Sequence, residues 1–219
     1  MASGSPPTLR IPLALLAIAN LVILAIRLRP WHDALNLPVN GTSGIDPVVI
    51  LLGYVGLIFW INSIKETKYQ AAMGEGTMLG LLAGAILVGE VLIASGSPGQ
   101  ASAIQIGLFV AASIVAGISG LRGARITGNA GIGMVSGIWC AMVGCLIACT
   151  AVLLKIDVAT PQPLTSDPWK QYEGLAIGNH ATQVLVHSLI TATGFILVGP
   201  LIGGVLGLLF ALFGQNDKS

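Results

Sequence analysis

The sequence predicts an all-α polytopic membrane protein, a bundle of six transmembrane helices with an interfacial amphipathic helix before the last span. Only 9% of the 219 residues are charged, whereas charged residues make up about a quarter of an average soluble domain. The mean hydropathy is +0.88, and apolar runs recur at the ~17–25 residues that cross a bilayer. The net charge of +1 argues against nucleic acid or a strongly acidic partner.

The whole chain, residues 1–219, is predicted to be a single membrane domain, because the loops are too short to hold a soluble one. The first apolar run ends in arginines and lacks a small-residue cleavage site, so it is interpreted as an uncleaved span. Short basic loops are expected at 65–69 and 122–125. The spans are expected at residues 11–28, 47–64, 76–95, 102–121, 131–154 and 184–213.

The longest connection, residues 155–182, leads into the last span. Asp167-Pro168 in this connection is typical of a helix N-cap followed by proline in the first turn. We expect an amphipathic helix to begin there and to run along the membrane surface. Pro200 lies inside the last span and is expected to kink or interrupt it, because proline removes a backbone donor.

Lysine and arginine residues orient the chain, because they are enriched on the cytoplasmic side of a membrane. The resulting bias places both termini in the cytoplasm, and the expected location is a bacterial cytoplasmic (inner) membrane. One predicted side holds Arg10, Lys65, Lys68, Arg122, Arg125 and Lys218, and the other holds Arg27, Arg29, Lys155 and Lys170.

The three cysteines lie in one apolar run and give no information on redox compartment.

Small residues repeat every four positions in three of the predicted spans. Lipid gives helices no hydrophobic reason to associate, so such stripes pack helices by close backbone approach. We expect packing within one chain, and a homodimer interface on the last stripe is the alternative. The glycines of these stripes are Gly76, Gly80, Gly84, Gly133, Gly137, Gly199, Gly203 and Gly207.

The pattern G-x-G-x-x-x-G opens both the third and the fifth predicted span, starting at Gly74 and at Gly131. Each copy follows a short basic loop. A tandem hairpin repeat over residues 74–121 and 131–213 would explain the two copies. Chance recurrence in glycine-rich helices is the alternative.

Glu90 is the single carboxylate inside an apolar run. A charge at the membrane centre costs from ~3 to more than 10 kcal/mol, so acidic residues there usually face a partner or a cavity. At ~100° per residue, Glu90 lies about 80° from the centre of the glycine stripe on its helix, so it points to the packed side or its flank rather than squarely at lipid. A proton or cation site is the functional interpretation, and a carboxyl that snorkels to the interface is the structural one.

A second polar feature follows one face of the predicted last helix. An interfacial amphipathic helix explains its first half. Two histidines on this face lie about 10 Å apart along the helix, too far to share one metal ion, and no metal or cofactor is predicted. We hypothesise that Glu90 and this face line one water-accessible pocket in the outer leaflet. The candidate residues of the pocket on this helix are His180, Gln183, His187 and Thr191.

The segment Ser136–Gly144 resembles the sequence around the catalytic serine of rhomboid intramembrane proteases, which would make His187 the base. In that family a glycine stands two residues before the serine, where this chain has Met134. The second span also lacks the family's histidine and asparagine. Ser136 and His187 are predicted near opposite ends of their spans, so no catalytic residue is assigned.

The function favoured by the sequence is small-solute or ion handling through an outer-leaflet polar pocket. A non-catalytic structural or assembly subunit of a larger membrane complex is the alternative, and an intramembrane enzyme is a remote one. The expected partners are the lipid bilayer and either further copies of the chain or another membrane protein. Asn20, an amide inside the first span, is expected to bond to a neighbouring helix.

Overall fold

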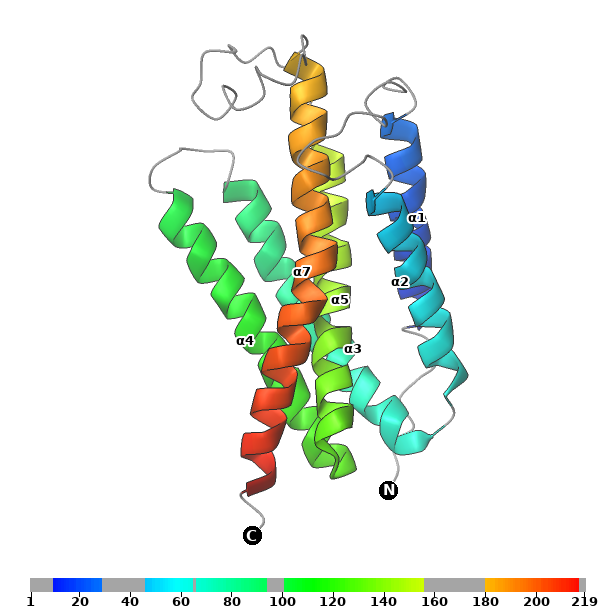
Figure 1. Cartoon of the computed structure of the whole chain (residues 1–219), viewed down its shortest axis with the longest axis vertical. Coiled ribbons are helices and arrows are strands. Elements are labelled where there is room, and N and C mark those ends of the chain that lie inside the picture. Colours follow the sequence, from blue (N-terminus) through cyan, green and yellow to red (C-terminus); the bar gives the residue numbers. More distant parts are fainter. Residues whose placement is uncertain (1–9, 29–45, 65, 94–100, 156–179, 217–219) are drawn as a thin grey trace.

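The computed structural model describes residues 10–28, 46–64, 66–93, 101–155 and 180–216, which form six α-helices (Figure 1). Consecutive helices run in opposite directions (Figure 1). We call the end where α3 finishes and α4 begins the upper end, and the end where α4 meets α5 the lower end. The all-α prediction is confirmed. The helices are α1 (Arg10–Leu28), α2 (Asp46–Ser63), α3 (Thr67–Ile93), α4 (Ala101–Thr127), α5 (Ala130–Lys155) and α7 (His180–Asn216).

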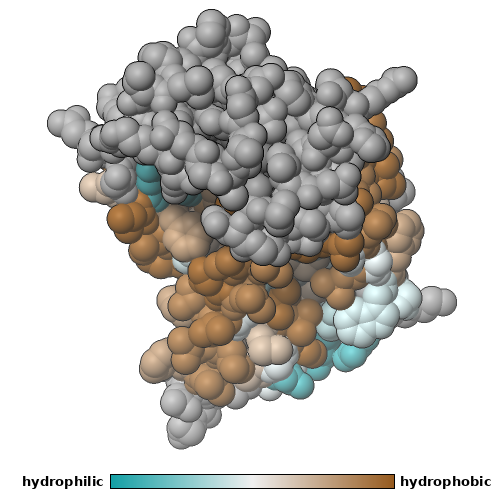
Figure 2. Space-filling view, turned by 45° about the horizontal axis from the view of Figure 1, so that its top comes forward, coloured by the Kyte–Doolittle hydropathy of each residue, from teal (hydrophilic) through white to brown (hydrophobic). Residues whose placement is uncertain are grey.

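Four of these helices are long and apolar enough to cross a bilayer. Their outer faces carry large exposed apolar side chains, such as Met78, Ile106 and Leu201, and Figure 2 shows apolar side chains on the flanks of the bundle. A surface of this kind is suited to lipid, so the helices are those of an integral membrane protein. The four spans are Thr67–Ile93, Ala103–Thr127, Ala130–Leu154 and Ile190–Gly214.

The two remaining helices are shorter. Their apolar stretches in the described part of the chain are Leu13–Ile26 in α1 and Val48–Trp60 in α2. The two helices pack on each other, α1 contacts α5, and α2 contacts α7 (Figure 1). The prediction of six spans is therefore supported for four helices, and the crossing by α1 and α2 stays a prediction. The surface helix expected to begin at Asp167 lies outside the described residues.

The basic loop predicted at 122–125 is helical, and α3 already begins at Thr67 within the loop predicted at 65–69, so this part of the prediction is wrong. Lys68 belongs to α3, and Arg122 and Arg125 belong to α4. The backbone continues its helical hydrogen bonds past the apolar region, while the long basic side chains remain exposed. Arg122 forms an exposed ion pair with Glu75, with 3.0 Å between Nη1 and Oε2, and this pair joins α3 to α4.

The connection between α4 and α5 is reduced to Gly128 and Asn129. Gly128 adopts a φ of 72°, and its N–H donates to the carbonyl of Ala124 at 2.7 Å. A glycine in the left-handed (αL) conformation therefore caps the C-terminus of α4. The Asn129 side chain then accepts the N–H of Gly131 at 2.8 Å and caps the start of α5. These local bonds bring α4 and α5 together as an antiparallel pair.

α5 is the central helix. Of its apolar span, 72% of the residues are buried, against 28–39% for the other three spans. Its neighbours are α1, α3, α4 and α7. This burial follows from the composition of α5, which carries glycine, alanine and cysteine on several faces and so lets neighbouring backbones approach closely.

The glycines of the three stripes face other helices of the same chain. A Cβ added to Gly80 would lie 2.6 Å from Cβ of Val143, and one added to Gly203 would lie 2.5 Å from Cβ of Ala141. Real side chains do not approach this closely, so these positions hold no residue larger than glycine without a shift. Gly76 and Gly84 likewise face α5, Gly133 faces α4 and α7, Gly137 faces Gly203 and Gly207, and Gly199 faces Cys145.

Buried hydrogen bonds also connect the helices. Nδ2 of Asn20 donates to the Thr150 hydroxyl at 2.9 Å and to the carbonyl of Leu146 at 3.3 Å, which joins α1 to α5. The expectation that Asn20 bonds to a neighbouring helix is confirmed. The indole N–H of Trp139 donates to the hydroxyl of Thr77 at 2.8 Å and joins α5 to α3.

α7 continues through Pro200 as one helix from His180 to Asn216. The interruption that we considered at this proline is not present. Proline has no N–H, so the carbonyl four residues earlier, that of Ile196, loses its helical partner. The hydroxyl of Tyr54 donates to this carbonyl at 2.6 Å. A neighbouring helix therefore supplies the missing donor, as membrane helices with internal prolines require.

Candidate functional site

Glu90 lies near the upper end of α3, which finishes at Ile93. The residue is half-buried. Its Oε2 atom is buried and has no hydrogen-bond partner in the described structure. A buried carboxylate oxygen is normally paired, because leaving it without a partner costs free energy in a low-dielectric environment. Glu90 therefore has an open position for a proton, a cation or a hydrogen-bond donor.

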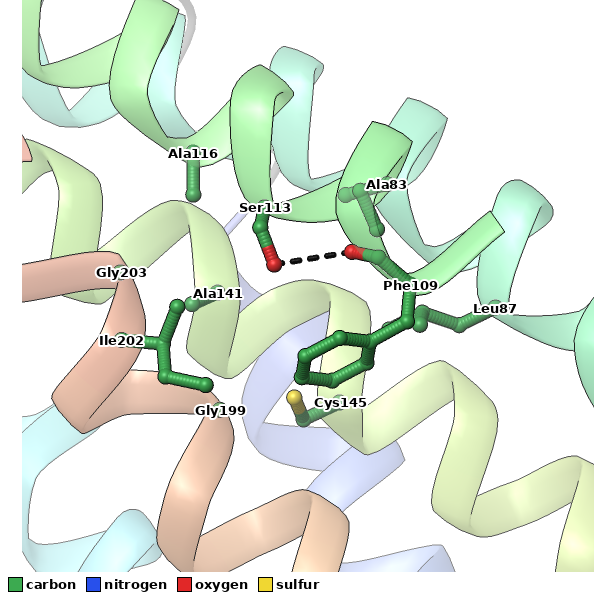
Figure 3. Close-up of a pocket in the computed structure, with 11 residues that line it drawn as sticks. Ala83, Leu87, Phe109, Ser113, Ala116, Ala141, Cys145, Gly199, Ile202 and Gly203 are labelled. Atoms are coloured by element: carbon green, nitrogen blue, oxygen red, sulfur yellow. Dashed lines mark hydrogen bonds between the residues drawn. The ribbon is translucent and has the colours of Figure 1, made fainter. Parts of the chain in front are cut away.

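A cavity of about 30 Å³ lies on the same side of α3 as Glu90. At ~100° per residue, Glu90 is only about 20° from Ala83 and about 60° from Leu87 around the helix axis, and both of those residues line the cavity. Glu90 follows Leu87 by three residues, so it lies roughly one turn above the cavity. Figure 3 shows the lining, which comes from α3, α4, α5 and α7: Ala83, Leu87, Phe109, Ala112, Ser113, Ala116, Ala141, Cys145, Gly199, Ile202 and Gly203.

The cavity is predominantly apolar, and its small residues create the space. The hydroxyl of Ser113 is occupied by a 2.8 Å bond to the carbonyl of Phe109 in its own helix. The Phe109 ring lies beside Cys145 in Figure 3. Since Glu90 lies about one turn above Leu87, which lines the cavity, the carboxyl and the cavity belong to one region of the bundle.

The predicted pocket on α7 is described only in part. The side chains of His180, Gln183 and His187 lie outside the described residues. Thr191 is half-buried and lies eight residues before Gly199, about 12 Å along the helix at ~1.5 Å per residue. The hypothesis that these four residues share a pocket with Glu90 remains a hypothesis.

The α7 residues that do share a cavity with α3 are Gly199, Ile202 and Gly203. The small-residue stripe predicted helix packing for the two glycines, and Ile202 was not among the predicted site residues. The sequence feature that indicates these residues is the number of small side chains in α4, α5 and α7. Small side chains leave unfilled volume where four helices meet. Which stripes face each other is a tertiary property, so the cavity could not be located from spacing alone.

Ser136, the residue in the rhomboid-like segment, is fully buried. Its hydroxyl donates to the carbonyl of Ala72 at 3.1 Å and lies 2.9 Å from the hydroxyl of Ser119. These contacts join α5 to α3 and α4. The geometry therefore gives Ser136 a part in helix packing.

Among the described residues, no three histidine, cysteine, aspartate or glutamate side chains lie together in a way that could hold a metal ion. The three cysteines of α5 are free thiols and are buried. No protein-family model, no curated protein and no solved structure matches the chain.

Proposed function

We propose that this integral membrane protein handles a small solute or ion, and that Glu90 binds the cation, proton or hydrogen-bond donor that is handled. The supporting observation is the buried Oε2 atom of Glu90, which has no hydrogen-bond partner among the residues that the structure describes. An ionisable side chain in a membrane-spanning helix is expensive to keep, and such residues usually mark ion, proton or substrate sites.

The neighbouring cavity supports a small ligand. A water molecule needs at least ~10–15 Å³ of cavity volume measured in this way, and the cavity has about 30 Å³. Its apolar walls exclude competing dipoles, which strengthens the attraction between the carboxylate and a cation. With both termini in the cytoplasm, as the lysine and arginine distribution favours, this site lies in the outer leaflet.

The experiment is ion flux in proteoliposomes, measured with an entrapped pH-sensitive dye and repeated with sodium and potassium gradients. We expect the wild-type protein to dissipate at least one gradient faster than empty liposomes, and Glu90→Gln to slow that flux by tenfold or more. Glu75→Gln is the matched control, because Glu75 is a carboxylate of the same helix in an exposed ion pair, which contributes little to stability. Equal flux through the wild-type protein and Glu90→Gln would overturn the proposal.

The second candidate is a structural or assembly subunit of a larger membrane complex. It is supported by the described interior, where glycine contacts and buried hydrogen bonds join neighbouring helices. Purification in a mild detergent separates the two functions. A stoichiometric partner protein together with no flux for any ion would favour the subunit.

A further inference from the structure

A second and larger cavity lies at the lower end of the bundle. It has a volume of about 360 Å³ and lies between the last turns of α4 and α7. This volume is within the range of ~300–1,000 Å³ that is typical of small-molecule sites. The lining residues are Leu121, Arg125, Phe210, Phe213 and Gly214.

The two helices form this cavity because Gly214 has no side chain. A Cβ at Gly214 would collide with the Leu121 side chain, and it would lie 3.7 Å from Nε of Arg125. Glycine at this position therefore lets α7 approach α4 beside Arg125. The two phenylalanines supply apolar walls, and Phe213 is 73% exposed at the surface of the bundle.

Arg125 is the single charged residue of this lining. It lies in the last turn of α4 and is exposed. Arg122, one turn earlier, forms an ion pair with Glu75 and does not line the cavity. A guanidinium has five N–H donors in a fork that fits a phosphate, and it can hold a phosphate alongside other partners.

The depth of the cavity matches the position of lipid headgroups. The membrane-spanning stretches Ala103–Thr127 and Ile190–Gly214 both end at this level. Phosphates of the lipid lie where the hydrocarbon region ends, and basic pockets between membrane helices bind anionic headgroups. The apolar walls are suited to the acyl chain that accompanies such a headgroup.

We propose that this cavity is a binding site for an anionic phospholipid of the surrounding membrane. Arg125 binds the phosphate, and the first part of an acyl chain lies against Phe210 and Phe213. A membrane phospholipid is favoured over free phosphate because four of the five lining residues are apolar. This site is independent of Glu90, which lies near the opposite end of the bundle.

The experiment is native mass spectrometry of the full-length protein in detergent, titrated with phosphatidylglycerol, phosphatidylcholine or inorganic phosphate. We expect phosphatidylglycerol to bind the wild-type protein at least tenfold more tightly than phosphatidylcholine does. Arg125→Gln should lose this preference, whereas Arg122→Gln should retain it. Arg122 is the matched control, because it is an exposed arginine of the same helix.

If Arg125→Gln does not fold, Arg125→Lys provides a second variant, which keeps the charge and loses the fork. This variant should bind phosphatidylglycerol several-fold more weakly than the wild-type protein. Equal binding of the two lipids by the wild-type protein would overturn the proposal. Binding of inorganic phosphate as tightly as the lipid, or an unchanged preference in both Arg125 variants, would overturn it as well.

Discussion

The hydroxyl of Tyr54 in α2 donates a 2.6 Å hydrogen bond to the carbonyl of Ile196 in α7. This carbonyl is the one that Pro200 deprives of its helical N–H. Tyr54 is buried, so water does not reach the bond. The pairing explains why α7 accepts an internal proline, and it couples the α1–α2 pair to the rest of the bundle.

Tyr54→Phe should lower the free energy of unfolding by about 1–2 kcal/mol, because it leaves a buried carbonyl without a donor. Pro200→Ala restores the helical N–H, so the same tyrosine substitution should cost much less in that background. Thermal unfolding in detergent of the wild-type protein, the two single variants and the double variant gives the coupling free energy between Tyr54 and Pro200. Strictly additive effects of the two substitutions would show that Tyr54 does not compensate for the proline.

Gly203→Ala should lower stability by about 1–3 kcal/mol, because the added methyl overpacks a closed interface. The methyl would lie 2.5 Å from Cβ of Ala141. Gly194→Ala in the same helix is the control, since nothing lies within 4 Å of its Cβ position. The melting temperatures of Gly203→Ala and Gly194→Ala in detergent are compared with that of the wild-type protein. If both substitutions have the same effect, the stripe does not pack against α5.

Asn20→Leu and Thr150→Val should each lower stability by roughly 0.5–2 kcal/mol, the range for hydrogen bonds between membrane helices. The double variant should be little worse than either single one, because both substitutions remove the same bond. Ser113→Ala is a suitable control, since that hydroxyl bonds only within α4. Additive losses in the double variant would contradict a shared bond.

Gly128→Ala should lower stability by about 1–2 kcal/mol, because a Cβ disfavours the left-handed conformation at this position. The effect is conformational, since nothing lies within 4 Å of the added carbon. Gly128→Asn should be tolerated better, because asparagine adopts this conformation more readily. Chemical unfolding in detergent measures the stability of both variants and of the wild-type protein. Equal stability of Gly128→Ala and wild type would contradict the left-handed conformation of Gly128.

The apolar runs were sufficient to predict the four long helices, because a stretch that crosses lipid must be both apolar and helical. The span predicted at 131–154 differs from α5 by one residue at each end. The prediction failed at Lys68 and Arg125, where helices continue into polar sequence. Hydropathy carries no signal for a helical turn that lies beyond the hydrocarbon region.

Glu90 could be selected from the sequence, because a carboxylate in an apolar run is unusual in itself. Its cavity could not, because Ala83 in α3 and Gly199 in α7 line it from helices far apart in the chain. The same limit applies to Tyr54, whose partner lies 142 residues away. Small residues predict close packing, but their spacing does not identify which helix they pack against.

The crossing by α1 deserves a direct test, because its register against α5 is unusual. Asn20 is bonded to Thr150, which lies twenty residues after the start of α5 and only five before its end. α1 begins ten residues before Asn20, so its first residue lies about 15 Å below the Asn20–Thr150 bond at ~1.5 Å per residue. α5 begins twenty residues before Thr150, so it extends about 30 Å below the same bond. α1 therefore covers only the upper part of α5.

Three single-cysteine substitutions determine the topology in sealed vesicles with a membrane-impermeant maleimide. The native cysteines are buried, so the background should be low. If all six helices cross, Ser3→Cys and Asn129→Cys label from one side and Thr42→Cys labels from the other. We expect this result, because the basic residues favour termini on the same side as the α4–α5 connection. Labelling of Ser3→Cys from the same side as Thr42→Cys would show that α1 does not cross, which leaves five spans.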